Sequence, residues 1–126
     1  MKLNHIGLNV VSENEIDTFY KSVLGFSEER SFELNELLSG EIFGIDNKAK
    51  VFLLKNNDLI LELFVNKNIV QNGYNHLCID VENRNEIVKK CERSGYETVV
   101  KKRTGKPDMI FVKDKSGNIF ELKEKQ

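Results

Sequence analysis

The sequence is poor in several residue types that define whole classes of protein. Its 126 residues include one proline, two cysteines, two histidines and no tryptophan. Cys78 and Cys91 have neither the spacing of a zinc motif nor that of a redox pair, which excludes a disulfide scaffold and a zinc finger. We therefore expect a reduced, cytoplasmic setting for this chain.

Net charge of one sign and long apolar runs are also lacking. The formal net charge is −1, so electrostatics give no reason to expect binding to nucleic acid or to a membrane surface. No apolar run approaches membrane-spanning length, and a strand pattern begins at the first residues, so we expect no signal peptide. With 40% hydrophobic and 31% charged residues, the chain fits one compact globular domain covering residues 1–126.

What the sequence does contain is an internal repeat, which is clearest around the two histidines. Residues 4–10 read NHIGLNV and residues 75–81 read NHLCIDV, a shift of 71 residues. Near the ends of the two copies, a shift of 59 aligns Phe52, Ile60, Glu62 and Leu63 with Phe111, Ile119, Glu121 and Leu122. The first copy is therefore 71 − 59 = 12 residues longer. We interpret the chain as two copies of one module, spanning 1–67 and 72–126.

Each copy has the periodicities of a βαβββ module. In the first, an alternating strand over 3–11 precedes a helix opened by a Ser12/Glu15 capping box and ended by Gly25. A further strand is predicted over 26–32. Two more are predicted over 51–65, one on each side of a polar turn at 56–58. The second copy repeats this order, with strands over 75–81 and 96–102, a helix over 84–94 and two strands around the 114–117 turn. The extra residues 34–44 are predicted to form a short helix that packs on another part of the molecule. The fold class is α+β.

The alternation of side chains along these strands separates four polar residues from the apolar faces. His5 and His76 point away from the apolar faces that the helices are expected to cover. Glu62 and Glu121 each stand between apolar neighbours in the last strand of their module, where an unpaired carboxylate is costly. Each residue alone has an ordinary structural explanation, but the four agree in face, repeat position and chemistry. A two-fold relation between the two modules would bring the four side chains together, which predicts a divalent transition-metal site.

Two further segments connect the chain with a known family. FYKSVLGF at 19–26 and DKSGNIFEL at 114–122 resemble motifs of the glyoxalase I / vicinal oxygen chelate superfamily, and the likeness covers the whole chain. The resemblance implies a cupped, barrel-like mixed sheet with its helices outside and one metal ion inside. It also implies that the metal ligands are His5, Glu62, His76 and Glu121.

This ligand set is most similar to that of bacterial lactoylglutathione lyase-like proteins (glyoxalase I). The similarity implies a homodimer with a bound metal, nickel or cobalt being favoured and zinc being possible. It implies conversion of the hemithioacetal of a 2-oxoaldehyde such as methylglyoxal and a thiol into a 2-hydroxyacyl thioester. The proton moves through an enediolate that the metal stabilises. Glu121 is the predicted base, and Glu62 is a ligand or a second base.

The thiol co-substrate is glutathione or another low-molecular-weight thiol. Asn66 matches a glutathione-contacting residue of that enzyme, whereas Asn9 stands where the enzyme has an arginine that helps hold glutathione. Asn9 and Asp80 are candidates to orient the imidazoles or to contact substrate, and ordinary polar strand ends are the alternative. Arg103 and Lys106 belong to a basic run able to hold a carboxylate or phosphate, with solvated surface as the alternative.

Two other functions are compatible with these residues. The first is a 2-epimerase like methylmalonyl-CoA epimerase, which the predicted helix before the third strand favours, although such enzymes usually carry Gln at the position of Glu62. The second is a metal-free small-molecule binding or resistance protein.

Overall fold

The computed structural model describes residues 1–68, 71 and 73–125. By its internal contacts the chain divides into two units, Met1–Ile69 and Val70–Gln126. The predicted module boundaries at residues 72 and 126 lie outside the described residues, and the prediction of a single domain stays a prediction.

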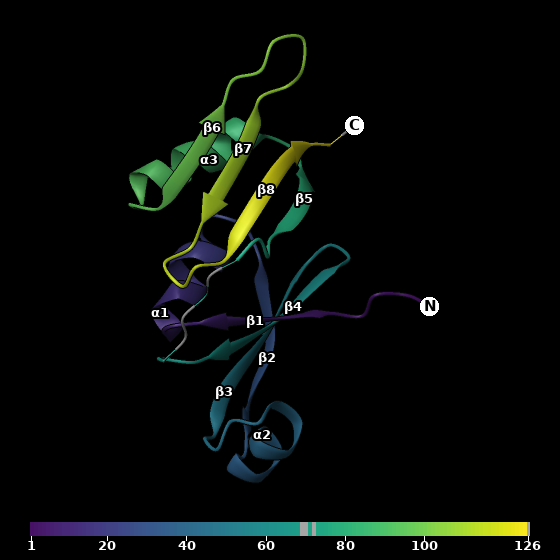
Figure 1. The fold of residues 1–126 in the computed structure, drawn as a ribbon, viewed down its shortest axis with the longest axis vertical. Coiled ribbons are helices and arrows are strands. Elements are labelled where there is room, and N and C mark those ends of the chain that lie inside the picture. The colour runs from purple at the N-terminus through teal and green to yellow at the C-terminus, as the bar shows by residue number, and fades with distance from the viewer. Residues whose placement is uncertain (69–70, 72, 126) are drawn as a thin grey trace. The chain divides into compact units, whose positions relative to one another are not determined.

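Unit 1 contains four strands and two helical segments (Figure 1). In chain order these are β1 (Ile6–Val10), α1 (Glu13–Glu15) continuing as the π-helix η1 (Ile16–Lys21), β2 (Ser27–Leu34), α2 (Glu36–Phe43), β3 (Ala49–Asn56) and β4 (Leu59–Val65). The sheet order is β1-β4-β3-β2, with β1 parallel to β4 and the other pairs antiparallel. The α2 helix is the addition that was predicted over 34–44.

Unit 2 has the same connectivity without an equivalent of α2. Its elements are β5 (Leu77–Val81), α3 (Arg84–Arg93), β6 (Glu97–Lys101), β7 (Met109–Lys113) and β8 (Ile119–Glu124). The sheet order is β5-β8-β7-β6, with β5 parallel to β8. The α+β fold of two tandem βαβββ modules is therefore confirmed, and each module forms its own four-stranded mixed sheet.

Strand register shows which residues of the two modules are equivalent. Gly7 pairs with Glu62 across β1 and β4, and Cys78 pairs with Glu121 across β5 and β8. These pairs reproduce both predicted shifts, since 78 − 7 = 71 and 121 − 62 = 59.

The predicted match of Phe52 with Phe111 is wrong by one residue. Leu53 faces Glu62 and Phe111 faces Glu121, so the shift between β3 and β7 is 111 − 53 = 58. The cause is a β7–β8 connection one residue longer than the β3–β4 connection. Lys55 pairs with Ile60 in the first hairpin, whereas Lys113 pairs with Ile119 in the second.

The first helix buries one apolar stripe, but its start differs from the predicted capping box. The side chains of this stripe are almost completely buried, namely Ile16, Phe19, Tyr20 and Val23. Ser12 is the N-cap, yet it makes no side-chain cap hydrogen bond, so the predicted capping box does not form there. At the other end, Gly25 takes a positive φ of 77°, and the Phe26 amide donates to the Tyr20 carbonyl at 2.9 Å.

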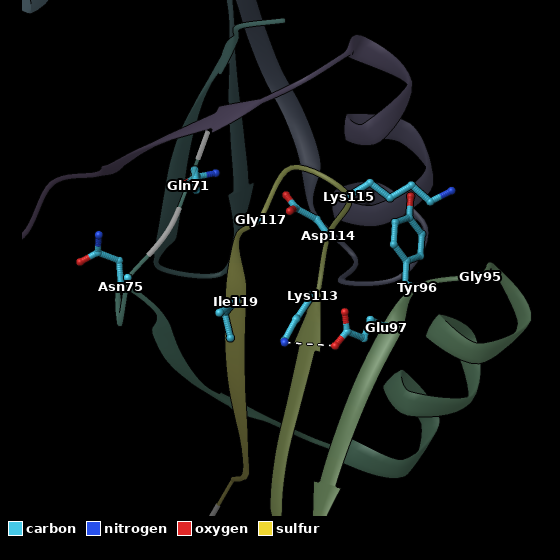
Figure 2. A pocket seen from close by; sticks show the side chains of 11 residues that line it. Gln71, Asn75, Gly95, Tyr96, Glu97, Lys113, Asp114, Lys115, Gly117 and Ile119 are labelled. Carbon is cyan, nitrogen blue, oxygen red and sulfur yellow. Dashed lines mark hydrogen bonds and ion pairs between the residues drawn. The ribbon is translucent and has the colours of Figure 1, made fainter. Parts of the chain in front are cut away.

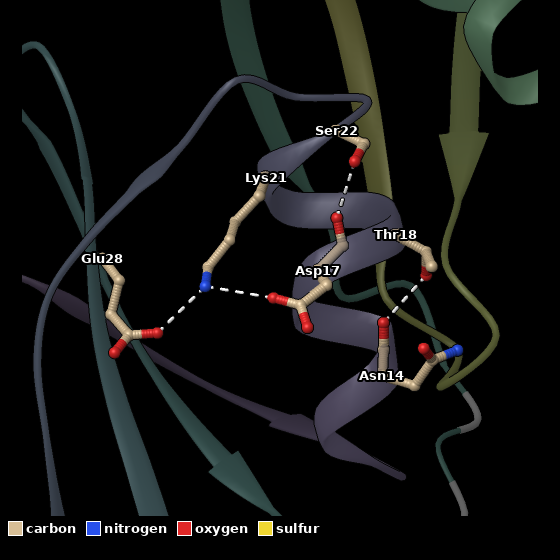
Figure 3. A network of polar contacts seen from close by, with 6 residues as sticks. All are labelled: Asn14, Asp17, Thr18, Lys21, Ser22 and Glu28. Carbon is tan, nitrogen blue, oxygen red and sulfur yellow. Dashed lines mark hydrogen bonds and ion pairs between the residues drawn. The ribbon is translucent and has the colours of Figure 1, made fainter.

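Polar side chains link this helix to the following strand (Figure 3). The Lys21 ammonium lies 3.0 Å from a carboxylate oxygen of Asp17, one helical turn earlier, and 3.0 Å from one of Glu28 in β2. The hydrogen bonds that its ammonium donates to the two carboxylates raise the pKa of Lys21, so its charge persists throughout the neutral range.

The core of unit 2 lies between α3 and its sheet. The α3 helix packs against β6, β7 and β8, and the residues buried in this unit include Cys91, Ile110, Val112, Phe120 and Leu122. Burial raises the pKa of the Cys91 thiol to about 11, so it is a neutral core group. Because side chains alternate along a strand, Phe111 and Glu121 point to the face of the sheet away from α3.

The β7–β8 loop is organised by one buried carboxylate, that of Asp114. Its Oδ1 accepts hydrogen bonds from the Ser116 and Asn118 amides at 2.9 and 2.8 Å, and its Oδ2 accepts one from the Asn118 side chain at 2.8 Å. The side-chain amide of Gln71 donates to the Ser116 carbonyl at 2.7 Å, which links the start of unit 2 to the same loop. The DKSGN part of the family-like motif is thus a structural turn preceding the strand that carries Glu121.

Replacing this carboxylate is expected to destabilise the protein. In Asp114→Ala, two buried backbone amides lose their acceptor, and we expect the free energy of unfolding to fall by about 2 kcal/mol. Asp58→Ala, in the exposed turn of the first hairpin, is the matched control and should change stability by less than about 0.5 kcal/mol. Urea denaturation followed by circular dichroism measures both. Equal losses in the two variants would contradict the role assigned to Asp114.

Candidate functional site

In unit 1, His5 and Glu62 come together as predicted. His5 directly precedes β1 rather than lying within it, and its Nε2 is 3.7 Å from Oε2 of Glu62. The other ring nitrogen, Nδ1, donates to the side-chain oxygen of Asn4 at 2.9 Å. The imidazole is 41% exposed and the Glu62 side chain 19%, so the pair is accessible to a ligand.

Unit 2 repeats this arrangement. His76 directly precedes β5, and its Nε2 lies 3.7 Å from Oε1 of Glu121. Its Nδ1 donates to the backbone carbonyl of Tyr74 at 2.8 Å. The side-chain exposures, 45% and 21%, are close to those of the first pair.

The Nδ1 contacts determine which ring nitrogen is available for a ligand. A carbonyl oxygen only accepts hydrogen bonds, so Nδ1 carries the proton and Nε2 of the neutral ring keeps its lone pair on the side of the glutamate. Metal-binding histidines are typically oriented in this way by a second polar group. Asn4 and the Tyr74 carbonyl supply the orientation, and sequence reasoning did not single out either of them.

Each pair has the donor types and the spacing for one ion but too few ligands to complete a site. Metal–nitrogen and metal–oxygen distances of about 2.1 Å each sum to about 4.2 Å, so a single ion can contact two atoms that are 3.7 Å apart. Structural and catalytic transition-metal sites use at least three protein ligands. Among the described residues, no group of three or more His, Cys, Asp and Glu side chains is arranged so that it could hold a metal ion. Each unit therefore carries half of the predicted ligand set.

The residues that pair with the two glutamates differ between the units. In unit 2, the Cys78 thiol hydrogen-bonds to Glu121, and burial together with the nearby Glu121 charge raises the pKa of the thiol. In unit 1, the equivalent residue is Gly7, and a Cβ built there would lie 3.4 Å from a ring carbon of Phe64. The Phe64 ring therefore lies within contact distance of the space in front of Gly7.

Next to the Glu62 pair, α2 and the sheet enclose a cavity of about 270 Å³. It is lined by the candidates Asn9 and Asn66 together with Gly7, Phe43 and Phe64, among others. Phe64 shares a strand face with Glu62, and the Phe43 ring at the end of α2 contacts it edge-on, with the ring centres 5.4 Å apart. In unit 1, α2 therefore lies over the sheet face that carries Glu62.

In unit 2, a cavity of about 440 Å³ reaches Glu121 itself. Its lining includes two predicted residues, Asp80 and Arg103, together with Arg84. The Arg103 Nε donates to the Pro107 carbonyl at 2.9 Å, and the Arg84 Nη1 donates to the Asp108 carbonyl at 2.8 Å. The Arg84 Nε is buried without a hydrogen-bond partner. Lys106 is exposed in the neighbouring loop, and its role stays a prediction.

A cavity of about 740 Å³ lies on unit 2 and was not expected from the sequence (Figure 2). Its lining includes Ile119 and Asn75. Ile119 lies two residues before Glu121 on the same strand face, and Asn75 is the neighbour of His76. The Lys113 ammonium in this lining is 3.1 Å from a carboxylate oxygen of Glu97. This face of the unit 2 sheet therefore carries cavities at both ends of the Glu121 strand.

Comparison with known proteins identifies the family. Residues 2–122 match the Glyoxalase/Bleomycin resistance protein/Dioxygenase superfamily, and the chain belongs to that superfamily. No curated protein matches the chain.

Solved structures of the superfamily share the fold. A glyoxalase family protein from Enterococcus faecalis is 22% identical, with a TM-score of 0.72 and coverage of 96% of this chain and 95% of its own. The trypanothione-dependent glyoxalase I of Leishmania major is 20% identical, with a TM-score of 0.72 and coverage of 98% and 86%. The fosfomycin resistance protein FosX of Listeria monocytogenes, complexed with Mn(II) and sulfate, is 20% identical, with a TM-score of 0.71 and coverage of 99% and 93%.

None of the helices formed by the described residues has both the length and the apolar character needed to cross a lipid bilayer.

Metal binding is the direct test of the histidine–glutamate pairs. After incubation with Ni²⁺ and dialysis, the untagged wild-type protein should retain about one ion per chain, measured by inductively coupled plasma mass spectrometry. His5→Ala, His76→Ala and Glu121→Gln should each lose most of this metal, because each removes one ligand. Glu97→Gln is the matched control, since it alters an exposed carboxylate of the same sheet, and it should retain the ion. Equal retention in all variants would contradict the assignment.

Proposed function

We propose that this protein is a metal-dependent lyase or isomerase of the glyoxalase I type. Its substrate is the hemithioacetal formed by a 2-oxoaldehyde such as methylglyoxal and a low-molecular-weight thiol. The observation that carries the proposal is the repeated His–Glu pair, with the same 3.7 Å separation and the same Nδ1 orientation in both modules. Superfamily membership supports it at the level of the general chemistry.

The proposed metal ligands are His5, Glu62, His76 and Glu121. Two ligands from each module complete the four that a single transition ion takes, which explains why neither unit alone has enough. Two imidazoles and two carboxylates suit nickel, cobalt or zinc better than calcium or magnesium, which prefer oxygen ligands. Bound there, the ion acts as a Lewis acid that stabilises negative charge on two neighbouring substrate oxygens.

The side chains of the protein carry out the proton transfer. The Glu121 carboxylate takes the proton from the carbon that bears the hydroxyl group and the sulfur, and returns it to the adjacent carbonyl carbon. The hydroxyl proton moves to the former carbonyl oxygen, so the product is the 2-hydroxyacyl thioester, with no net gain or loss of atoms. His5 and His76 stay fixed through their Nδ1 contacts, and the Cys78 thiol holds Glu121 by a hydrogen bond. Glu62 serves as a ligand and as a second base.

Polar groups of the adjoining cavities are proposed to hold the thiol, which is glutathione or a related small thiol. Arg103 lines the cavity that Glu121 reaches, and Asn9 and Asn66 line the cavity beside the Glu62 strand. Lys106 contributes positive charge from the neighbouring loop. A cytoplasmic homodimer completes the proposal.

Enzyme assays with Ni²⁺-loaded protein test this function. Thioester formation from methylglyoxal and glutathione, or another small thiol, is followed by ultraviolet absorbance. Glu121→Gln should lower kcat by about 10²- to 10⁴-fold, because it removes the carboxylate that accepts the substrate proton as well as a proposed metal ligand. Glu97→Gln should leave kcat unchanged.

The same protein preparation separates the alternative functions. Epimerisation of methylmalonyl-CoA without any thioester formation would replace the proposal by a 2-epimerase, an alternative favoured by the α2 helix before β3. Tight binding of small molecules by metal-free protein, with no turnover of either substrate, would make it a binding protein.

A further inference from the structure

The two modules have equivalent cavities at the beginning of their glutamate strands. The unit 1 cavity, of about 490 Å³, is lined by Lys2, Leu3, Asn4, Lys55, Asp58 and Ile60. By the shifts of 71, 58 and 59 residues, Asn4, Lys55 and Ile60 correspond to Asn75, Lys113 and Ile119, which line the unit 2 cavity of about 740 Å³. The charges of the two cavities can therefore be compared position by position.

The unit 1 cavity is separate from the groups proposed to bind the metal and the thiol. It lies at the β3–β4 turn, near the first residues of the parallel strands β1 and β4. Asn9 and Asn66 line a different cavity, near the last residues of the same two strands. None of the proposed metal ligands belongs to the described lining of the cavity at the turn.

The lining of the unit 1 cavity carries an excess of positive charge. Lys2 and Lys55 make no ion pair with any of the described residues. Asp58 is the one carboxylate in the described lining, so the formal charge of the lining is 2 − 1 = +1. Two like charges at one concave surface repel each other, and an anion bound between them removes this repulsion.

In unit 2 the equivalent lysine is already neutralised. The Lys113 ammonium lies 3.1 Å from a carboxylate oxygen of Glu97, the residue directly across from it in β6 (Figure 2). In unit 1, the residue directly across from Lys55 is Ser27, which has no charge. The described charged residues of the unit 2 lining balance to 2 − 2 = 0, namely Lys113, Lys115, Glu97 and Asp114. Of the two cavities, only that of unit 1 favours an anion.

Asn4 adds hydrogen-bond donors to the two cations. Its side-chain oxygen is engaged by the His5 Nδ1 at 2.9 Å. The amide nitrogen of the same side chain makes no hydrogen bond with the described residues, so its two N–H groups are available to a ligand. An oxyanion accepts hydrogen bonds both from such an amide and from lysine ammonium groups, and the latter bonds are strengthened by charge.

The contact between Asn4 and His5 also connects this cavity to one of the two imidazoles. An anion bound to the Asn4 amide contacts the side chain that orients His5. His76 is oriented by the backbone carbonyl of Tyr74, so the equivalent Asn75 does not hold its ring. Occupation of the unit 1 cavity is therefore expected to affect the surroundings of His5 alone.

We propose that the cavity at the β3–β4 turn is a binding site for an oxyanion, a phosphate or carboxylate group, held by Lys2, Lys55 and the Asn4 amide. Its volume of about 490 Å³ lies within the range of small-molecule sites, so it has room for an organic molecule that carries the group. A free inorganic anion offers the same chemistry. The site goes beyond the proposed function and depends on neither metal binding nor turnover.

Titration of metal-free protein with inorganic phosphate tests the site. The ¹³C,¹⁵N-labelled protein is kept at constant pH and at constant ionic strength, balanced with sodium chloride, and followed by amide and aromatic correlation spectra. We expect saturable shifts for the Asn4 side-chain amide and for the backbone amides of Lys55 and Asp58. The His5 ring signals should shift with the same saturation, whereas those of Asn75 and His76 should not.

Four variants identify the charges that hold the anion. Lys2→Gln and Lys55→Gln should each raise the Kd for phosphate about threefold to tenfold, because each removes a charged donor. Asp58→Asn should lower the Kd, because it removes the negative charge from the lining. Lys89→Gln is the matched control, since Lys89 is an exposed lysine of α3 outside this lining, and it should leave the Kd unchanged.

A second titration, with glutathione, identifies the source of the anion. Glutathione carries two carboxylates and no phosphate. If it shifts the same amides and competes with phosphate, the site holds a carboxylate of the thiol. If phosphate alone shifts them, the site holds a free anion or a phosphate ester.

Three results would overturn the inference. They are the absence of saturable phosphate shifts at the β3–β4 turn, equal shifts in the two cavities, and equal effects of Lys55→Gln and Lys89→Gln. Because the protein is free of metal throughout, a failure of the proposed enzyme activity leaves these measurements unaffected. Conversely, an absence of phosphate binding would leave the proposed metal site untouched.

Discussion

The parallel pairing of the first and last strands of each module is the constraint on which the candidate site depends. It sets Gly7 opposite Glu62 and Cys78 opposite Glu121, and so brings the histidine just before each first strand to the glutamate of each last strand. A slip of one residue in this pairing would turn the carboxylate to the other face of the sheet. The buried leucines that alternate with Glu62, Leu61 and Leu63, oppose such a slip because they would become exposed.

Two local contacts orient the histidine rings relative to the glutamates. The histidines lie outside the regular strands, so the ladder hydrogen bonds do not fix their side chains. Asn4 and the Tyr74 carbonyl supply the missing constraint by holding Nδ1 in each ring. Both copies therefore have an imidazole whose Nε2 faces a glutamate. The Nδ1 atom is held by a side chain in one copy and by the backbone in the other.

The two copies have also diverged where they adjoin their glutamates. In unit 1, the extra residues form α2, which closes an apolar cavity against Phe64. In unit 2, the corresponding end of the sheet carries arginines and carboxylates, and Cys78 contacts Glu121. Two modules of one fold therefore carry the same His–Glu pair with different surroundings, which is what recognition of an asymmetric small molecule requires.

The sequence by itself determined the module order, the strand faces and the four candidate ligands, because strand periodicity and the repeat are local properties of the chain. It also located α2, but not the surface that α2 covers. Only the tertiary structure decided the register of β7 against β8, where one additional loop residue moved Phe111 opposite Glu121. It also decided the covering of the Glu62 face, the contacts of each Nδ1 and the cavities. These depend on contacts between residues far apart in the chain or on single rotamers, and neither leaves a periodic signal in the sequence.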